Sequence, residues 1–553
     1  MDYDRLAQLV FPDIRDTVEQ LFAKYPHRAL PRDACVTRFA PSPTGFMHIG
    51  GLYAAMISRR IAKQSGGVFY LRIEDTDKKR EVEGGVSEII SALRDFGIVF
   101  DEGPTDETAE SGAYGPYKQS HRKALYQTVA KDMMRRGLAY PCFCTAGELE
   151  AIRKEQEDNK EPTVGYYGRY ARCRDLPLEE VERRLRAGEE FVVRLRSPGD
   201  ETRRIVCHDL VRGDIEFPEN ILDVVLLKSD GIPTYHFAHV VDDTLMGTTH
   251  VIRGDEWLSS YPVHEQLFAA AGFRLPRYIH IAPIMKLDGA SKRKLSKRKD
   301  PEAAVSYYHQ EGYPPDAVLE YLMTIANSSY EEWRLAHPQA DTTDYRLKLD
   351  KMPAAGALFD MDKLADVSKD VVAAKSQQQC FDEISAWAAR FSPDLQAFIQ
   401  AHPDGFMATI DLWKHSGKKV RKDIGKWSDL LRMYDYLYRP AFTPGAYEFD
   451  ETLTPAQARE FLEAYLPAYD PALDSSGWFA QVGQVGQGLG YCPNMKEYKL
   501  NPAGYKGSIA DACSILRVAV TGRRNTPDLY TILHILGPEE ARRRMAACAA
   551  ALA

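Results

Sequence analysis

The segment between residues 35 and 73 constrains the fold more than any other part of the chain. Residues 35–40 (CVTRFA) are predicted to form a short strand, which the prolines of the following PSPTG sequence end. Apolar side chains then recur with helical spacing over about 50–64, Gly66-Gly67 stops the helix, and residues 68–73 form a second strand. A strand, a helix and a strand in this order predict a right-handed βαβ unit with a parallel sheet.

The same alternation returns much later in the chain. Residues 223–227, 249–253 and 278–282 are strand-like, and a helix is predicted over 258–271. We therefore predict an α/β fold in which one doubly wound, Rossmann-like parallel-sheet domain is split by an α+β insertion. From about residue 311 helical periodicity dominates, so the C-terminal half is expected to be all helical.

Composition excludes several classes of protein. The chain has 553 residues, a hydrophobic fraction of 44% and no signal-like or membrane-spanning apolar segment. Nine cysteines scattered along a chain of this length do not form a disulfide framework, so we expect a reduced, cytoplasmic protein that contacts no membrane. The net charge of −8 argues against coating nucleic acid over the whole surface. Two basic runs, 286–299 and 414–426, favour local contacts with an extended anionic partner.

The first motif whose residues could take part in binding or catalysis is the loop 41–51 (PSPTGFMHIGG), between the predicted strand and helix. Ligands of open parallel sheets bind beyond the carboxyl ends of the strands, where a helix N-terminus presents N–H groups to phosphate. Gly50 and Gly51 lack a Cβ and let a nucleotide approach the backbone, and His48 can donate to a phosphate oxygen. Alone, His48 would be interpreted as a cap or a core residue, but the surrounding motif favours a nucleotide site.

The second motif is 294–298 (KLSKR), which follows the strand predicted to end at 282. Two lysines, Lys294 and Lys297, with Gly289 upstream, predict a mobile basic loop. Such a loop can close on a triphosphate and neutralise the charge that moves onto leaving pyrophosphate. Taken alone, the pentamer also fits a solvated basic turn. Its order and spacing relative to the first motif favour the nucleotide role.

Together the two motifs resemble the signatures of class I aminoacyl-tRNA synthetases, and the chain is most similar to the bacterial glutamyl-tRNA synthetases. His48-Ile49-Gly50-Gly51 resembles the HIGH signature, and 294–298 resembles the KMSKS signature. Other matching segments cover most of the chain: 37–40 (TRFA), 72–77 (RIEDTD), 115–120 (GPYKQS), 228–238 (KSDGIPTYHFA), 240–243 (VVDD) and 516–523 (LRVAVTGR).

The resemblance implies an ATP-dependent glutamate–tRNA ligase. L-glutamate would be activated with ATP to glutamyl adenylate, and the acyl group would pass to the 3′ end of tRNA(Glu). A carboxylate is already nucleophilic at neutral pH, so the first step needs positioning and charge stabilisation rather than a base. The implied catalytic residues are His48, Gly50, Lys294 and Lys297. The implied ATP contacts are Pro41, Gly45, His48, Gly50, Gly51, Trp257, Ser296 and Lys297. Trp257 fits a core anchor equally well, and Mg²⁺ is expected with ATP.

Glutamate recognition requires a cation for the side-chain carboxylate and an anion for the amino group. Arg38, at the end of the first strand, can bind the γ-carboxylate bidentately, and Glu74, after the second strand, can hold the ammonium. A surface ion pair of little energetic value is the alternative for both. The resemblance adds Ser42, Tyr235, His239 and Arg253 as amino-acid contacts. His239 stands where relatives often have a small polar residue such as asparagine.

Three cysteines of the predicted insertion suggest a metal site. Cys142 and Cys144 are followed by Cys173, and some relatives bind structural zinc here through two close cysteines, a later cysteine and a histidine or tyrosine. Zinc takes four ligands, and Asp175 rather than histidine follows Cys173. The candidate ligands are therefore Cys142, Cys144, Tyr170 and Cys173. A zinc site and a cluster without metal both remain open.

The resemblance also implies a domain organisation and a monomer. Its segments are an N-terminal extension (1–34), the two halves of a catalytic nucleotide-binding domain (35–120 and 223–310), an insertion that binds the acceptor end (121–222), a stem-contact helical domain (311–380) and a helical anticodon-binding domain (381–553). The basic residues 418–422 with Trp427 are candidate RNA contacts, with helix-surface charges and a core tryptophan as the alternative. The roles of 1–34 and 330–350 are unassigned.

Two other functions fit parts of the sequence. A glutaminyl-tRNA synthetase is the nearest alternative, but PSPT at 41–44 and the all-helical C-terminal half favour glutamate. A catalytically silent tRNA-binding paralogue would be free to lose His48 or the lysine motif, and this chain retains both.

Overall fold

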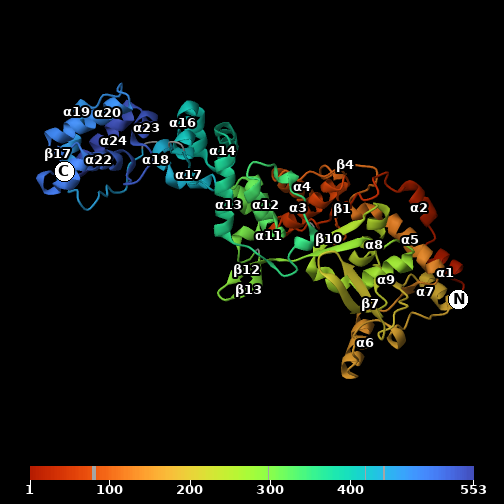
Figure 1. Ribbon diagram of the computed structural model, residues 1–553. Coiled ribbons are helices and arrows are strands. Elements are labelled where there is room, and N and C mark those ends of the chain that lie inside the picture. The colour runs from red at the N-terminus through yellow and green to blue at the C-terminus, as the bar shows by residue number, and fades with distance from the viewer. Residues whose placement is uncertain (78–81, 297, 417–418, 440–441) are drawn as a thin grey trace. The chain divides into compact units, whose positions relative to one another are not determined.

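A computed structural model describes residues 1–77, 82–296, 298–416, 419–439 and 442–553 (Figure 1). The chain forms two compact units, one of residues 1–307 with 319–360 and the other of 308–318 with 361–553. It passes between them within helix α10 (Val305–Glu311), within α11 (Pro315–Ala326) and after Asp360. Much of the segment expected to be a stem-contact domain therefore belongs to the first unit.

The predicted βαβ unit is present in the first compact unit. Strands β1 (Val36–Phe39) and β2 (Val68–Leu71) are parallel, and α3 (Ile49–Gln64) connects them. The return into β2 requires glycine, because a Cβ on Gly67 would lie 2.0 Å from the carbonyl oxygen of Cys35. The strand ends and the N-terminus of α3 thus face the same edge of the sheet.

A second parallel pair lies beside β1. It consists of β10 (His250–Gly254) and β11 (Arg277–Ile281), connected by α9 (Tyr261–Ala271). The backbone N–H of Thr249 donates to the carbonyl of Val36, which joins this pair to β1. Helix α8 (Tyr235–Leu245) precedes β10 and packs against α9. These two parallel pairs and their helices match the predicted doubly wound domain.

Strand partners near the insertion differ from the prediction. Strand β7 (Arg204–Asp209), from the predicted insertion, pairs in parallel with β11, and β8 (Gly213–Pro218) pairs antiparallel with β7. Conversely, β9 (Val225–Leu227), assigned to the catalytic domain, pairs antiparallel with β6 (Val192–Leu195) of the insertion. A short apolar run indicates a buried strand but not its partner.

The remainder of the insertion is mixed α and β. Strand β5 (Ala139–Cys142) pairs antiparallel with β6, and three helices accompany the sheet: α5 (Lys123–Arg135), α6 (Ala146–Asp158) and α7 (Leu178–Arg186). A capping box between Thr145 and Glu148 begins α6, as the sequence of a helix start would require. The first half of the unit also contains α4 (Gly85–Asp95), β3 (Gly103–Pro104) and β4 (Glu110–Ser111).

The N-terminal extension is an integral part of this unit. Helices α1 (Tyr3–Val10) and α2 (Val18–Lys24) pack against α5 (Figure 1). Lys131 of α5 donates to the carbonyls of Phe11 and Ile14. Arg28 binds Glu102 through both of its terminal nitrogens, at 2.6 and 2.7 Å. These contacts give the extension a bracing role between the insertion and the first half of the catalytic domain.

Residues 319–360 pack on the outside of α3. Arg60 donates to the carbonyl of Thr342, and Gln64 to that of Leu347. This segment contains α12 (Tyr330–Ala336) and β14 (Ala357–Leu358). Strand β14 joins a small sheet with β12 (Ile284–Asp288) and β13 (Ser291–Lys294). The segment without an assigned role therefore supports the helix that begins at His48.

The second unit is helical, as predicted, with pairs of two-residue strands. The helices are α13 (Met361–Ala374), α14 (Gln377–Phe391), α15 (Pro393–Ala401), α16 (Pro403–Lys414), α17 (Ser428–Met433), α18 (Asp435–Tyr438), α19 (Pro455–Ala468), α20 (Ser475–Gly488), α21 (Met495–Leu500), α22 (Ile509–Thr521), α23 (Leu529–Leu536) and α24 (Pro538–Ala551). The strands are β15 (His415–Ser416), β16 (Lys419–Val420), β17 (Tyr491–Cys492) and β18 (Gly507–Ser508). Capping boxes at Ser376, Thr454 and Ser508 begin α14, α19 and α22. Within the described ranges, no helix is both long and apolar enough to cross a bilayer.

Candidate active site

A cavity of about 510 Å³ lies at the carboxyl ends of β1, β2, β10 and β11. This is the edge at which open parallel sheets bind ligands. Most of the predicted site residues line it: Arg38, Ser42, His48, Gly50, Gly51, Glu74, Tyr235, Arg253, Trp257 and Lys294. Four predicted residues do not line it: Pro41, Gly45, His239 and Ser296. Lys297 lies outside the described residues.

His48 caps the helix that it precedes. Its Nδ1 accepts a hydrogen bond from the backbone N–H of Gly50 at 3.0 Å. The Gly50 N–H is therefore not available to a phosphate, contrary to the expectation for this helix start. With Nδ1 as an acceptor, the neutral imidazole carries its proton on Nε2. A Cβ on Gly50 would lie 3.3 Å from His48 Nδ1, so the glycine leaves room for the capping ring.

The lysine motif begins where a β-hairpin ends. Strands β12 and β13 pair antiparallel, with Asp288 opposite Ser291, around a two-residue turn that begins at Gly289, whose φ is +62°. Lys294 ends β13 and lines the cavity, with its Nζ 3.5 Å from Glu256. After the motif, the N–H of Val305 donates to the carbonyl of Met47. The structure thus brings both motifs to one cavity.

Asp300 anchors the lysine motif, and the sequence interpretation missed it. Arg293 binds its carboxylate through both terminal nitrogens, at 2.6 and 2.8 Å, and the N–H of Ser296 donates to it at 2.9 Å. These hydrogen bonds hold the pKa of Asp300 well below its usual range, and those from Arg293 have the largest effect. Ser296 therefore positions the motif through its backbone. The basic run 286–299 also carries less unpaired positive charge than the sequence suggests, because Lys286 and Arg293 both pair with Asp300.

Arg38 belongs to a buried charge network rather than to a surface ion pair. Its Nε lies 3.3 Å from Asp243, and Arg72 approaches the same carboxylate at 2.6 Å. Burial acts to raise the pKa of Asp243, but Arg38 and Arg72 hold it well below its ordinary value. Asp243 was not predicted as a functional residue. Its signal in the sequence is an acidic pair, Asp242-Asp243, inside an otherwise apolar helix, which demands cationic partners.

Glu74 is held at the cavity by its backbone and by Arg72. Its N–H donates to the carbonyl of Pro41 at 3.0 Å, and Arg72 donates to its carboxylate at 3.1 Å. Pro41 therefore positions Glu74 and does not itself face the cavity. Burial raises the pKa of Glu74, against the opposing effect of Arg72 and Arg38. The raised pKa means that Glu74 holds a proton more readily than an exposed glutamate does.

The aromatic wall of the cavity is formed by Tyr235 and Trp257, whose ring centroids are 4.2 Å apart. His239 is 1% exposed and does not line the cavity, and its ring stacks with that of Tyr235 at 6.3 Å between centroids. Its Nε2 lies 2.9 Å from the Tyr278 hydroxyl, and its Nδ1 lies 2.8 Å from Asp243. Burial lowers the pKa of His239 to about 4, so the ring is neutral at physiological pH.

Arg253 is 6% exposed and lines the cavity from β10. Two imidazoles, those of His264 and His280, accept hydrogen bonds from it at 3.0 and 2.9 Å. Neither histidine was predicted as part of the site. Histidines scattered at 264 and 280 carry no spacing signal, and only the parallel pairing of β10 with β11 places His280 beside Arg253.

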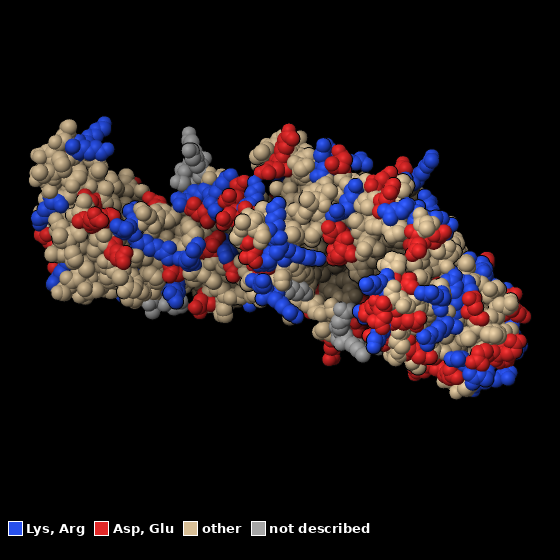
Figure 2. Space-filling model, turned by 90° about the horizontal axis from the view of Figure 1, so that it is seen from below, with Lys and Arg blue, Asp and Glu red and all other residues tan. Residues whose placement is uncertain are grey.

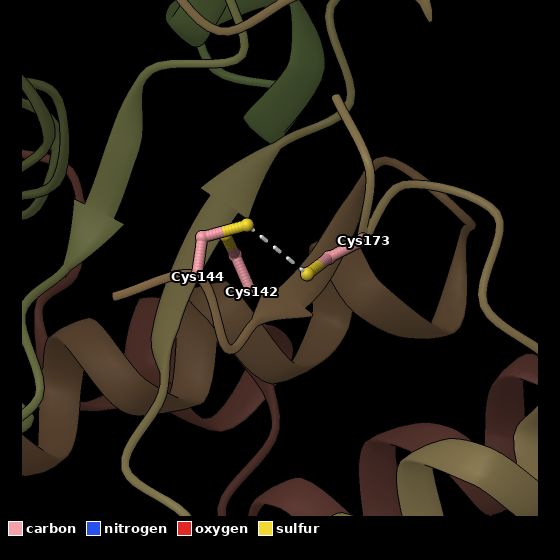
Figure 3. Close-up of side chains that lie close together, drawn as sticks. All are labelled: Cys142, Cys144 and Cys173. Atoms are coloured by element: carbon pink, nitrogen blue, oxygen red, sulfur yellow. Dashed lines mark hydrogen bonds between the residues drawn. The ribbon is translucent and has the colours of Figure 1, made fainter. Parts of the chain in front are cut away.

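The structure brings the three candidate cysteine ligands together but not the candidate tyrosine. The sulfur atoms of Cys142, Cys144 and Cys173 lie within 4.8 Å of one another, and those of Cys144 and Cys173 are 3.6 Å apart (Figure 3). Tyr170 is not among them, because its hydroxyl donates to Glu161. The hydroxyl of Tyr166 lies 3.3 Å from the sulfur of Cys144 instead. Hydrogen bonds from Cys144 and Cys173 lower the pKa of Cys142, which favours a thiolate. Three soft donors and a nearby hydroxyl fit zinc chemically.

The second basic run is not a free cationic surface in its described part. Lys414 is buried and donates to the carbonyls of Val372 and Ala373, and Lys422 pairs with Asp370. Trp427 is buried in the helical core, so it offers no exposed ring to a base. Lys418 lies outside the described residues. On the face seen in Figure 2, acidic and basic side chains are interspersed over the surface.

Comparisons with known proteins agree with this geometry. Residues 34–366 match the family described as the catalytic domain of class I tRNA synthetases (E and Q), and residues 506–549 match an anticodon binding domain. A glutamate–tRNA ligase of Clostridium perfringens strain 13 is 50% identical over 548 residues, covering 99% of this chain and all of the relative. One from Sorangium cellulosum is 44% identical, covering 96% of this chain and 97% of the relative.

A solved structure gives the same result. The crystal structure of a glutamate tRNA ligase from Elizabethkingia meningosepticum, in complex with its amino acid, has a TM-score of 0.75 and 27% identity, and it covers 94% of this chain and all of that one. The matches span both the catalytic unit and the helical unit. The chain therefore belongs to the glutamate–tRNA ligase family of class I tRNA synthetases.

Proposed function

We propose that the protein is a glutamate–tRNA ligase, which activates L-glutamate with ATP and transfers the glutamyl group to the 3′ end of tRNA(Glu). The observation that carries the proposal is a single cavity lined by His48, Lys294, Arg38 and Glu74. The first two suit a triphosphate, and the last two suit the charges of an amino acid with an acidic side chain. Relatives named glutamate–tRNA ligase over the whole chain length support the same activity.

In the first step the α-carboxylate of glutamate attacks the α-phosphate of ATP and pyrophosphate leaves. His48, with its proton on Nε2, donates to a phosphate oxygen, while Lys294 and Lys297 offset the charge that moves onto pyrophosphate. Mg²⁺ would enter with ATP, bound to phosphate oxygens, and would offset part of the same charge. The aromatic wall of Tyr235 and Trp257 confines the reactants beside the loop 41–51.

Amino-acid recognition is assigned to charges of opposite sign. Arg38 binds the side-chain carboxylate, Glu74 holds the ammonium, and Arg253 supplies a further guanidinium for a substrate carboxylate. Ser42 is exposed and lines the same cavity. A neutral glutamine side chain would leave a guanidinium without its anion, and leaving a charged group unmatched in such a site is costly.

The remaining assignments concern partners and metal. The insertion (121–222) is assigned to the acceptor end of the tRNA, 311–380 to its stem and the helical region 381–553 to its anticodon, in agreement with the anticodon-binding match at 506–549. Zinc is assigned to Cys142, Cys144 and Cys173, with Tyr166 rather than Tyr170 beside them. We expect a monomer that acts in the cytoplasm, where its tRNA is charged.

Glutamate-dependent exchange of pyrophosphate into ATP tests the proposal, measured with and without tRNA. We expect exchange with glutamate when tRNA(Glu) is present and none with glutamine. Lys297→Ala should cripple adenylate formation while tRNA binding persists, and Lys299→Ala, outside the motif, serves as its charge-matched control. Exchange with glutamine instead would indicate a glutaminyl enzyme, and tRNA binding without any exchange would indicate a silent paralogue.

A further inference from the structure

Arg253 differs from Arg38, the other arginine that lines the cavity, in having no ion pair with a carboxylate among the described residues. It is almost fully buried, yet it makes no ion pair with any carboxylate of the described part of the chain. Its Nη2 has no hydrogen-bond partner among those residues. A buried guanidinium with an unused donor is costly unless a ligand supplies the anion. The residues that hold Arg253 in this state are therefore of functional interest.

Two imidazoles hold Arg253, and both act as acceptors. Arg253 Nη1 lies 3.0 Å from His264 Nδ1, and Arg253 Nε donates to His280 Nε2 at 2.9 Å. A guanidinium can only donate, so each of these ring nitrogens must be unprotonated. Burial, the largest influence on each ring, lowers the pKa of both His264 and His280. Both rings are therefore neutral while they hold the cation.

The neighbours of the two rings fix their tautomers. The proton of His264 must lie on Nε2, which is 2.9 Å from Nδ1 of His236. The proton of His280 must lie on Nδ1, which is 2.8 Å from the carboxylate of Asp209. A hydrogen-bonded chain thus runs from Asp209 on β7 through His280, Arg253 and His264 to His236 on α8. Such second contacts orient a ring and set which nitrogen accepts.

The same contacts fix the orientation of the Arg253 guanidinium. The Arg253 Cζ lies 4.6 Å from the centroid of the Tyr278 ring, so an aromatic face covers one side of the group. Nε and Nη1 are occupied by the two imidazoles. The donor that remains is Nη2, on a residue that lines the cavity. The contacts thus orient the cation while leaving its charge uncompensated.

We propose that His264 and His280 are positioning residues for amino-acid recognition: as neutral hydrogen-bond acceptors, they hold Arg253 toward the substrate without neutralising it. A carboxylate in either place would orient Arg253 equally well, but it would compete with the carboxylate of the substrate. This inference rests on the proposed glutamate–tRNA ligase activity, since it assigns the anion that Arg253 receives.

Three substitutions at His264 separate orientation from charge. His264→Gln keeps a neutral acceptor, His264→Leu removes the acceptor, and His264→Glu has the shape of the glutamine variant but carries a negative charge. His250→Gln is the matched control, because His250 lies on the same strand as Arg253 and bonds to Thr249 instead. The measurement is the steady-state KM for glutamate and for ATP in tRNA-dependent pyrophosphate exchange by the full-length protein. The same substitutions at His280 test the second acceptor.

We expect the KM for glutamate to rise about 5- to 100-fold in His264→Leu, the range for a donor left without its partner. It should rise further in His264→Glu and stay near the wild-type value in His264→Gln and His250→Gln. The KM for ATP should not change in any variant. An unchanged glutamate KM in His264→Leu would overturn the positioning role.

A glutamate variant as active as the glutamine variant would overturn the requirement for a neutral acceptor, and this comparison holds even if the leucine variant folds poorly. Absence of exchange in the wild type would instead refute the proposed function, so the two failures are distinguishable.

Discussion

Arg38 and Arg253 occupy equivalent places on neighbouring strands, one near the end of β1 and the other near the end of β10. Arg38 shares the carboxylate of Asp243 with Arg72, whereas Arg253 is held by two neutral imidazoles. The first arginine therefore contributes to the buried charge balance of the fold as well as to the cavity. The second contributes a charge that only a ligand can balance. Equal position and residue type thus do not imply equal function.

The largest effect is expected on folding stability when Asp243, the carboxylate that pairs with Arg38 but not with Arg253, is replaced. Asp243→Asn leaves Arg38 and Arg72 without their shared anion in a fully buried site. Breaking a buried ion pair from one side costs about 3–5 kcal/mol of folding free energy. Urea unfolding followed by circular dichroism should show this loss, with His250→Gln as a control. If the Asn variant is as stable as the wild type, the pairing of Arg38 with Asp243 does not contribute to the stability of the fold.

Glutamine substitution of each arginine should then separate their roles. Truncating one partner of a buried charge pair costs about 2–5 kcal/mol. We expect Arg253→Gln to lower kcat/KM for glutamate by a corresponding factor of about 30 to several thousand, with little loss of stability. Arg38→Gln should lower both glutamate use and stability, and Arg38→Ala should harm glutamate use more than ATP binding. Unchanged glutamate KM and kcat in either variant would remove that arginine from the site.

The pH dependence of glutamate use should reveal the carboxylate opposite these cations. Burial raises the pKa of Glu74, and the ammonium of the substrate requires the ionised form. As pH falls, kcat/KM for glutamate should therefore decline at a higher pH than an ordinary glutamate would give. In Glu74→Gln the value should be about tenfold or more lower near neutrality and should lose this acidic decline. If the decline persists in the glutamine variant, another group is responsible for it.

The smallest effect on glutamate use is expected at the cysteine cluster, which lies in the insertion. Cys144→Ser should lower the zinc content of the purified protein and its melting temperature, because a lost thiolate ligand weakens a structural site. The KM for glutamate should stay unchanged. Zinc measured by atomic emission, with Cys513→Ser as the control, tests this. A wild-type protein without zinc would show that the cluster is a packed set of thiols.

Local features of the fold could be predicted from the sequence, whereas long-range pairing could not. The βαβ unit follows from apolar spacing between breaks at prolines and glycines, and the structure confirms it. The partners of β7 and β9 depend on which buried edge each strand meets, and apolar runs carry no information about that. The hairpin that precedes the lysine motif was also missed, although Gly289 can supply the positive φ that a two-residue turn needs.

The same division applies to the site. Ser42, His48, Gly50 and Gly51 of the first motif and Lys294 of the second reach the cavity, because each motif fixes its own local geometry. Asp243, Asp300 and His264 were missed, because their roles arise from contacts between distant segments. Tyr170 was named as a candidate ligand for its closeness to Cys173 in the sequence, but its hydroxyl donates to Glu161 instead.

A crystal structure with a non-hydrolysable glutamyl adenylate analogue tests the account most directly. We predict that the phosphate of the analogue lies beside His48 and Lys294. A substrate carboxylate should lie within hydrogen-bonding distance of Arg253 Nη2, and the ammonium should lie beside Glu74. An analogue bound outside this cavity, or bound inside it without contacts to Arg253 and Glu74, would contradict the assignment of a single site for nucleotide and amino acid.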